Sequence, residues 1–267
     1  MIDRRRLLGG ASAALVTLAF PGAAPGADMT VRELAERLHG ADRAAPLQLR
    51  GLDLHELDLS GLDFKAASLA GSNLFGADLS GTDLSGADLQ GARLDRVVII
   101  GTRFDGANLT DTSFLRPSSS AGLTVREGEA ASFAAAKLTR SRIFGRFSRA
   151  NFSGADLSGA KFSPFNKTGF IENLWRTELA GADLSRANLA GADLTYALLS
   201  FANLRGANLT GATLARADLS RADLTGADLT GVDFAQADLD GAILTGAHGL
   251  ATAFGLDSAR NVERIVR

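Results

Sequence analysis

The chain has 267 residues, of which 46% are apolar and 22% are charged, as expected for one large globular domain or two small ones. It contains no cysteine, which excludes disulfides, thiol nucleophiles, cysteine-ligated zinc and iron–sulfur clusters. The formal net charge of -2 indicates no overall attraction to nucleic acid or to an anionic membrane.

Residues 1–27 have the pattern of an export signal. A basic cluster at 4–6 precedes an apolar stretch at 7–20, and small residues follow at 22–27. The apolar stretch is shorter than the roughly 20 residues of a membrane span. Two arginines followed, after one spacer, by leucines resemble a bacterial twin-arginine signal, carried here by Arg4, Arg5, Leu7 and Leu8. We therefore expect a periplasmic or secreted protein with no transmembrane helix in its mature chain; an ordinary secretory signal or an uncleaved anchor is the alternative.

Residues 28–48 are predicted to form an entry segment with a short helix. Thr30 and Glu33 have the spacing of a capping box, and Val31, Leu34 and Leu38 recur at helical spacing. The pattern predicts a helix over 30–39 that covers the first part of the region that follows.

A period of five residues runs through 49–247. Leucine, isoleucine or phenylalanine stands at every fifth position from Leu49 to Phe114, and again from Leu174 to Leu244. A small residue usually lies two positions earlier, Asp or Asn lies between, and Ser or Thr followed by Gly often comes after, so the unit is A-(D/N)-L-(S/T)-G.

This period fits neither an α-helix nor a straight strand. Five residues advance an α-helix by about 500°, so the leucines would not form a stripe. In a straight strand an odd period would alternate the leucines between faces. Both conflicts disappear if the chain turns a corner in each unit, with the leucine and the small residue inward and the Gly and Ser/Thr positions in the bend.

The unit resembles the pentapeptide repeat family over about 49–114 and 133–247. The resemblance implies an all-β solenoid: a right-handed quadrilateral β-helix with four pentapeptides per coil, which we expect to carry short helical caps at both ends. The leucines expected to stack in its core include Leu59, Leu79, Leu89, Leu184, Leu194, Leu209, Leu224 and Leu239.

Two interruptions, at 115–132 and 163–173, break the register and are predicted to be loops, where binding surfaces are common. Five basic residues without an intervening acid lie between 137 and 149. A solvated face is one interpretation of that run, and an interaction patch is the other. The side chains of that possible patch, together with aromatic residues near the second interruption, are Lys137, Arg140, Arg142, Arg146, Arg149, Phe165, Phe170 and Trp175.

Residues 248–267 are predicted to form a C-terminal cap or dimerisation segment, with a terminal helix over 257–267. The family is known to dimerise through C-terminal elements, so the resemblance allows a homodimer. The three histidines, His39, His55 and His248, are dispersed, and no nucleophile–base pair or metal-ligand spacing is present. We therefore expect no enzymatic activity, no catalytic or metal-binding residues and no cofactor.

The leading functional hypothesis is an exported, non-catalytic structural or protein-interaction module of the cell envelope, whose partner is another protein or an envelope component. The resemblance supplies an alternative, because the best understood members are DNA mimics that bind DNA gyrase and protect it from quinolones. The export signal and the near-neutral charge argue against it, and no nucleic-acid partner is expected. A third hypothesis is an envelope glycan- or lipid-binding protein that uses the basic run at 137–149.

Overall fold

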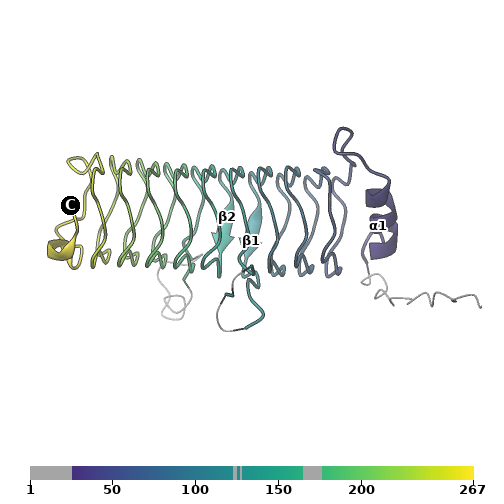
Figure 1. The fold of residues 1–267 in the computed structure, drawn as a ribbon, viewed down its shortest axis with the longest axis horizontal. Helices are drawn as coiled ribbons and strands as arrows, with labels where there is room; N and C mark the ends of the chain where they lie inside the picture. Colours follow the sequence, from purple (N-terminus) through teal and green to yellow (C-terminus); the bar gives the residue numbers. More distant parts are fainter. Residues whose placement is uncertain (1–25, 123–124, 127, 165–175) are drawn as a thin grey trace, which may run out of the picture.

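The computed structural model describes residues 26–122, 125–126, 128–164 and 176–267. The chain winds into an elongated solenoid whose coils stack in one row, with helix α1 (Val31–His39) at one end and the C-terminus at the other (Figure 1). Two short strands, β1 (Ser113–Leu115) and β2 (Arg142–Phe144), pair in parallel, and a 3-10 turn, η2 (Val262–Arg264), lies in the last coil. Nearly all other strand contacts are isolated parallel bridges between neighbouring coils.

The bridges show how many residues make one coil. Asp53 pairs with Asn73, and Asn73 pairs with Arg93; residues thus stacked lie 20 apart in sequence, which is four units of five. The chain therefore advances by one coil for every four pentapeptides. The predicted all-β solenoid is confirmed.

Each position of the pentapeptide has a defined place. Leu79 and Ala77 are fully buried, whereas Asp78 lies outside and its carboxylate accepts a hydrogen bond of 2.8 Å from the backbone N–H of Ser80. Gly81 then turns the corner at a φ of 66°, in the left-handed region that favours glycine. The eight leucines named above are all 0% exposed, so they form one stacked core.

Asparagine relieves the repulsion that stacked aspartates would create. The amide of Asn73 donates to the Asp53 carboxylate at 2.9 Å, and that of Asn108 donates to Asp88 at 2.9 Å, each across one coil. A side-chain amide accepts and donates, so it links a carboxylate to the next coil without adding charge. The interchange of Asp and Asn in the repeat thus serves coil-to-coil bonding.

Three coils of the middle region differ in length. Residues stacked across the first interruption lie 29 apart, those across the second lie 32 apart, and the coil between them has only 19 residues. The short coil loses one residue between Ile143 and Phe147, where Gly145 has a φ of 146°. Phenylalanines fill this part of the core: the ring of Phe133 stacks at 4.8 Å on Phe104 and at 4.7 Å on Phe152.

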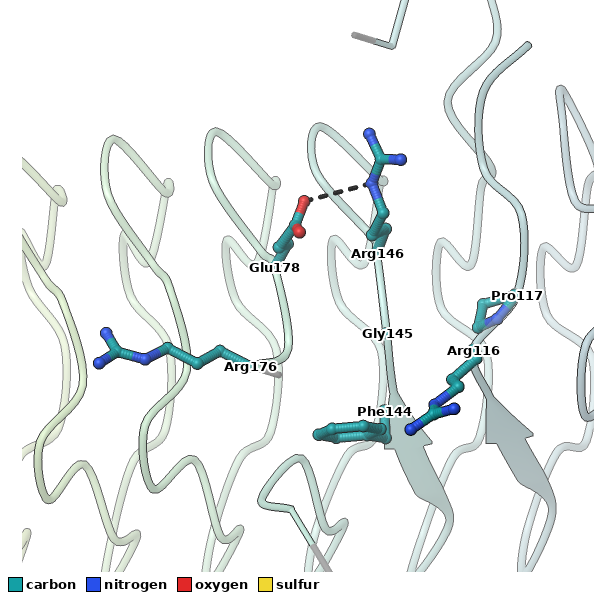
Figure 2. A pocket seen from close by; sticks show the side chains of 7 residues that line it. All are labelled: Arg116, Pro117, Phe144, Gly145, Arg146, Arg176 and Glu178. Carbon is teal, nitrogen blue, oxygen red and sulfur yellow. Dashed lines mark ion pairs between the residues drawn. The ribbon is translucent and has the colours of Figure 1, made fainter. Parts of the chain in front are cut away.

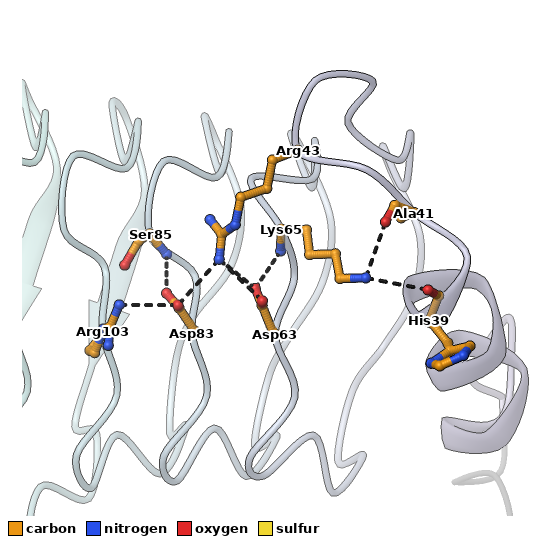
Figure 3. Close-up of polar contacts among 8 residues, drawn as sticks. All are labelled: His39, Ala41, Arg43, Asp63, Lys65, Asp83, Ser85 and Arg103. Carbon is orange, nitrogen blue, oxygen red and sulfur yellow. Dashed lines mark hydrogen bonds and ion pairs between the residues drawn. The ribbon is translucent and has the colours of Figure 1, made fainter.

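Helix α1 packs onto the first coils. Thr30 and Glu33 form the predicted capping box, and Val31, Leu34 and Leu38 are buried in the common core. The ammonium of Lys65 donates to the carbonyls of His39 at 3.3 Å and Ala41 at 3.1 Å, where the helix ends (Figure 3).

Charged side chains hold the segment after the helix against the coils. Arg43 bridges Asp63 at 2.9 Å and Asp83 at 3.4 Å, and Arg103 pairs with Asp83 at 3.1 Å (Figure 3). Burial alone would raise the pKa of Asp83, but hydrogen bonds from Ser85 and the charges of Arg103 and Arg43 outweigh it and hold that pKa below its usual range.

The C-terminal segment differs from the expected helix over 257–267. The chain continues the solenoid there: Phe254, Arg260 and Val266 bridge to the preceding coil, and only η2 is helical. The corners now come every six residues, at Gly249, Gly255 and Asn261, all with positive φ. The longer unit interrupts the leucine period, which is why the periodicity ended at 247 in the sequence.

Candidate functional site

One corner of the solenoid carries large side chains in several coils, at the position where the repeat prefers glycine. Backbone hydrogen bonds stack these corner residues from coil to coil: the N–H of Arg96 donates to the Leu115 carbonyl at 2.8 Å, and that of Arg116 donates to Phe144 at 2.6 Å. Further along, the N–H of Tyr196 donates to Ala215 at 3.0 Å. Residues distant in sequence therefore form one line along the molecule.

Three grooves follow this corner, and we call the side chains that line them the arginine edge. The N-terminal groove, of about 430 Å³, is lined by Phe75, Arg93, Asp95, Arg96, Leu115, Arg116 and Phe144. The central groove, of about 210 Å³, is lined by Arg116, Pro117, Phe144, Gly145, Arg146, Arg176 and Glu178 (Figure 2). The C-terminal groove, of about 380 Å³, is lined by Arg176, Tyr196, Arg216, Gln236, Ser258 and Arg260.

The grooves adjoin one another, because each shares lining residues with its neighbour. Arg116 and Phe144 line the first two, and Arg176 lines the last two. Together the linings hold seven arginines against two acids, Asp95 and Glu178. A chain with a net charge of -2 thus concentrates positive charge along one corner.

Some of these arginines are neutralised by ion pairs. Arg93 pairs with Asp95 at 3.0 Å, Arg146 with Glu178 at 3.4 Å (Figure 2), and Arg260 pairs with Asp238 at 3.2 Å. Exposed pairs of this kind contribute about 1 kcal/mol or less to stability.

Three of the other arginines pack on aromatic rings. The Arg96 guanidinium lies 5.5 Å from the ring centroid of Phe75, and those of Arg176 and Arg216 lie 5.9 and 5.3 Å from that of Tyr196. Arg216 also donates to the Tyr196 hydroxyl and, at 2.9 Å, to Gln236. Within the part of the chain that the structure describes, no carboxylate forms an ion pair with Arg96, Arg176 or Arg216.

Several corner side chains occupy a strained backbone position. Arg96, Arg116, Tyr196 and Arg216 have φ between 56° and 64°, where an L-residue costs about 1 kcal/mol relative to glycine. Gly76 takes the same place one coil before Arg96. The arginines are therefore not required by the fold at this position.

The side chains of the edge are chemically suited to anions. A guanidinium presents paired N–H donors that match carboxylate or phosphate oxygens, and it stays protonated at any physiological pH. It therefore supplies neither a general base nor a nucleophile. Across the described ranges, with 1–25, 123–124, 127 and 165–175 set aside, we find no group of three or more His, Asp or Glu that would hold a metal ion and no helix long and apolar enough to cross a membrane.

The structure does not bring the basic run at 137–149 together. Lys137, Arg142 and Arg146 belong to three different stacked columns, because each successive pentapeptide turns the chain onto the next face. Arg140 is held by Asp111, to which it donates at 2.9 and 2.7 Å, and this hydrogen bonding lowers the pKa of Asp111. Of the run, only Arg146 lines a groove; Arg149 occupies a positive-φ corner.

Other predicted site residues lie elsewhere. Those of the export signal, Arg4, Arg5, Leu7 and Leu8, and the aromatic residues Phe165, Phe170 and Trp175 are outside the described residues. The histidines have different surroundings: His39 ends α1, His55 contacts Asp53 at 2.8 Å, and His248 lies 3.5 Å from Asp228.

Comparison with known proteins identifies the repeat. The family model described as "Pentapeptide repeats" matches in eight copies, over residues 48–86, 72–111, 145–163, 173–211 and 207–246, which is more than half of the chain. No curated protein matches the sequence.

Solved structures with the same repeat are similar to this chain. HetL, a pentapeptide repeat protein involved in heterocyst differentiation regulation in the cyanobacterium Nostoc sp. strain PCC 7120, is 27% identical over 90% of this chain and 100% of its own, with a TM-score of 0.34. A pentapeptide repeat protein of the Arabidopsis thaliana thylakoid lumen is 26% identical over 48% and 76%, with a TM-score of 0.26. QnrB1, a plasmid-mediated fluoroquinolone resistance protein, is 23% identical over 82% and 96%, with a TM-score of 0.33.

The inward leucines, the 20-residue coils and the matched family model lead to one conclusion: this chain belongs to the pentapeptide repeat family.

Proposed function

We propose that the protein is an exported, non-catalytic interaction scaffold of the bacterial cell envelope that contacts another protein through its arginine edge. The observation that carries the proposal is the line of arginines along one corner, three of which, Arg96, Arg176 and Arg216, have no carboxylate partner among the described residues.

The ends of the solenoid support a scaffold role. A repeat array needs terminal units that shield its core. We infer that α1, with Leu34 fully buried, caps the N-terminal end. We infer also that the last coil, residues 248–267, whose units are six residues long, caps the other end. That coil exposes Phe254 and Val266 at 57% and 50%, so it is also where a homodimer would form; light scattering of the chain and of a Phe254→Ser/Val266→Ser variant tests this.

Export is tested by fractionation of a bacterium that expresses the chain. The native protein is expected to be processed and periplasmic, and an Arg4→Lys/Arg5→Lys variant to stay inside. If both stay unprocessed in the cytoplasm, export is wrong.

Contact with a protein is tested by a photo-crosslinking amino acid at Leu115 on the edge. The control is the same group at Phe201, which is 61% exposed on a different corner. A protein adduct from position 115 and none from 201 is expected, and equal adducts would contradict the proposal.

The two alternatives have less support. A DNA mimic requires a continuous acidic surface, whereas one corner here is arginine-rich, and a gyrase supercoiling assay with the purified chain tests that function. The glycan or lipid hypothesis depended on the run at 137–149, whose members lie on different faces.

A further inference from the structure

We propose that the arginine edge binds an acidic peptide segment in extended conformation, with one apolar side chain between its carboxylates. This inference rests on the proposed function, because it names the chemistry of the partner at the same edge. The apolar side chain lies in the central groove, and carboxylates on both sides of it meet the arginines of the outer grooves.

The central groove has an apolar floor between charged walls. Phe144 and Pro117 line it, and Phe144 lies between Arg116 and Arg176 (Figure 2). Since Phe144 is only 6% exposed, it forms the floor of the groove and does not protrude. A leucine-sized side chain suits this apolar floor, whereas a carboxylate placed against the Phe144 ring would lose part of its hydration there.

The outer grooves supply cations that are already oriented. Arg96 lies over the Phe75 ring at one end, and Arg216 is held by the Tyr196 ring and hydroxyl and by Gln236 at the other. An arginine held against a ring loses less rotamer entropy when it binds a carboxylate than a free side chain does. These positions are suited to bidentate pairs with Glu or Asp.

The length of the edge sets the length of the segment. The parallel bridges between neighbouring coils show that five coil-to-coil steps separate the corner of Arg96 from that of Arg216. At about 4.8 Å per step that distance is about 24 Å, which an extended peptide spans with about seven residues. Because the corner N–H groups already bond the next coil, recognition comes from side chains and not from an added β-strand.

The aromatic groups of the edge argue against a sugar or a nucleic acid. Those ligands stack on exposed ring faces, but Phe144 and Tyr196 are only 6% and 7% exposed, and Arg93 and Arg96 both lie over Phe75. A ligand that meets guanidinium groups and one apolar groove, and no free ring, is better matched by a peptide.

The first experiment measures binding of a labelled heptapeptide, Glu-Glu-Glu-Leu-Glu-Glu-Glu, to the purified full chain by fluorescence anisotropy. Saturable binding that weakens as salt rises is expected, because exposed ion pairs are screened. Replacing the central leucine with glutamate is expected to weaken binding about tenfold, from the loss of one buried apolar side chain. Equal binding of the two peptides would contradict the placement of an apolar side chain in the central groove.

The second experiment removes the outer arginines without harming the fold. Arg96→Gly and Arg216→Gly put into each corner the residue that the repeat itself prefers there, so the melting temperature is expected to hold or rise. Each is expected to weaken binding about fivefold. Arg221→Gly is the matched control, since Arg221 also has positive φ and lies 5.5 Å from a ring, that of Phe201, but lines none of the three grooves.

Several results would overturn the inference. They are no binding of the leucine heptapeptide, an equal loss with Arg221→Gly, or tighter binding of a sulfated oligosaccharide of equal charge or of vesicles that contain phosphatidylglycerol. If the crosslink at Leu115 still captures a protein while the heptapeptide fails, the partner chemistry is wrong and the scaffold function stands. If the heptapeptide binds and the crosslink fails, the scaffold function in the cell is wrong.

Discussion

Replacing Leu209 with alanine is expected to destabilise the protein by about 3 to 4 kcal/mol. Leu209 is 0% exposed, and the backbone ladders place it between Leu189 and Leu229 of the neighbouring coils. The change removes three buried carbons, worth about 0.8 kcal/mol each, and leaves a cavity that the rigid ladders prevent from closing. For a chain of this size that loss lowers Tm by about 6 to 16 °C.

The assay is thermal unfolding followed by circular dichroism, with hydrogen exchange to locate the loss. Since each coil contacts only its neighbours, protection is expected to fall first in the coils around 209. Leu256→Ala is the control, because Leu256 is only partly buried in the last coil, and a loss of about 1 kcal/mol is expected there. Equal losses at 209 and 256, or an unchanged melting curve for Leu209→Asp, would refute the inward stacking of leucines.

The remaining predictions concern the corners and the carboxylates. Gly81→Ala is expected to cost about 1 kcal/mol in chemical denaturation, since its φ is 66° and a Cβ there meets nothing within 4 Å, so only backbone strain acts. Gly249→Ala is expected to lower the free energy of unfolding by about 3 kcal/mol or more, because its Cβ would crowd the backbone of Thr230. A similar loss for Gly81→Ala and Gly249→Ala would refute the assignment of backbone strain alone to position 81 and of steric crowding to position 249. Burial alone would raise the pKa values of Asp156 and Asp223, but hydrogen bonds from neighbouring side chains and backbone outweigh it and lower them. Their contribution to stability is present above the unfolded pKa of about 3.9 and is lost as pH falls through the lower folded values, so Tm is expected to be level above about pH 5 and to drop below pH 4.

The fold was predictable because its physical cause is local. A leucine every five residues requires a corner in every unit, and the one-residue slip between Ile143 and Phe147 reappears as the 19-residue coil. The last coil was missed because its corners, Gly249, Gly255 and Asn261, follow a six-residue period that a search for leucine at every fifth position passes over. Those three residues, spaced by six, were the available signal.

The arginine edge was missed for a different reason. A run of charge along the chain wraps around the solenoid, so Lys137 and Arg142 separate, whereas residues 20 apart come together. Reading the sequence at that longer period places Arg96 with Arg116 and Tyr196 with Arg216, both at corner positions where the unit prefers glycine. The relevant signal was the departure from glycine, repeated at the period of a coil.

Several departures from the repeat lie on the corner of the arginine edge. Arg96 and Arg216 stand there at a position where the repeat prefers glycine, at a conformational cost, and the one-residue deletion at Gly145 interrupts the same line. Packing explains none of them, since the coils before and after maintain the core with the plain unit. Strain and a deletion therefore meet on the corner that also holds Arg96, Arg176 and Arg216, for which the described residues supply no carboxylate partner, and this coincidence supports the proposal that the corner recognises an anionic partner.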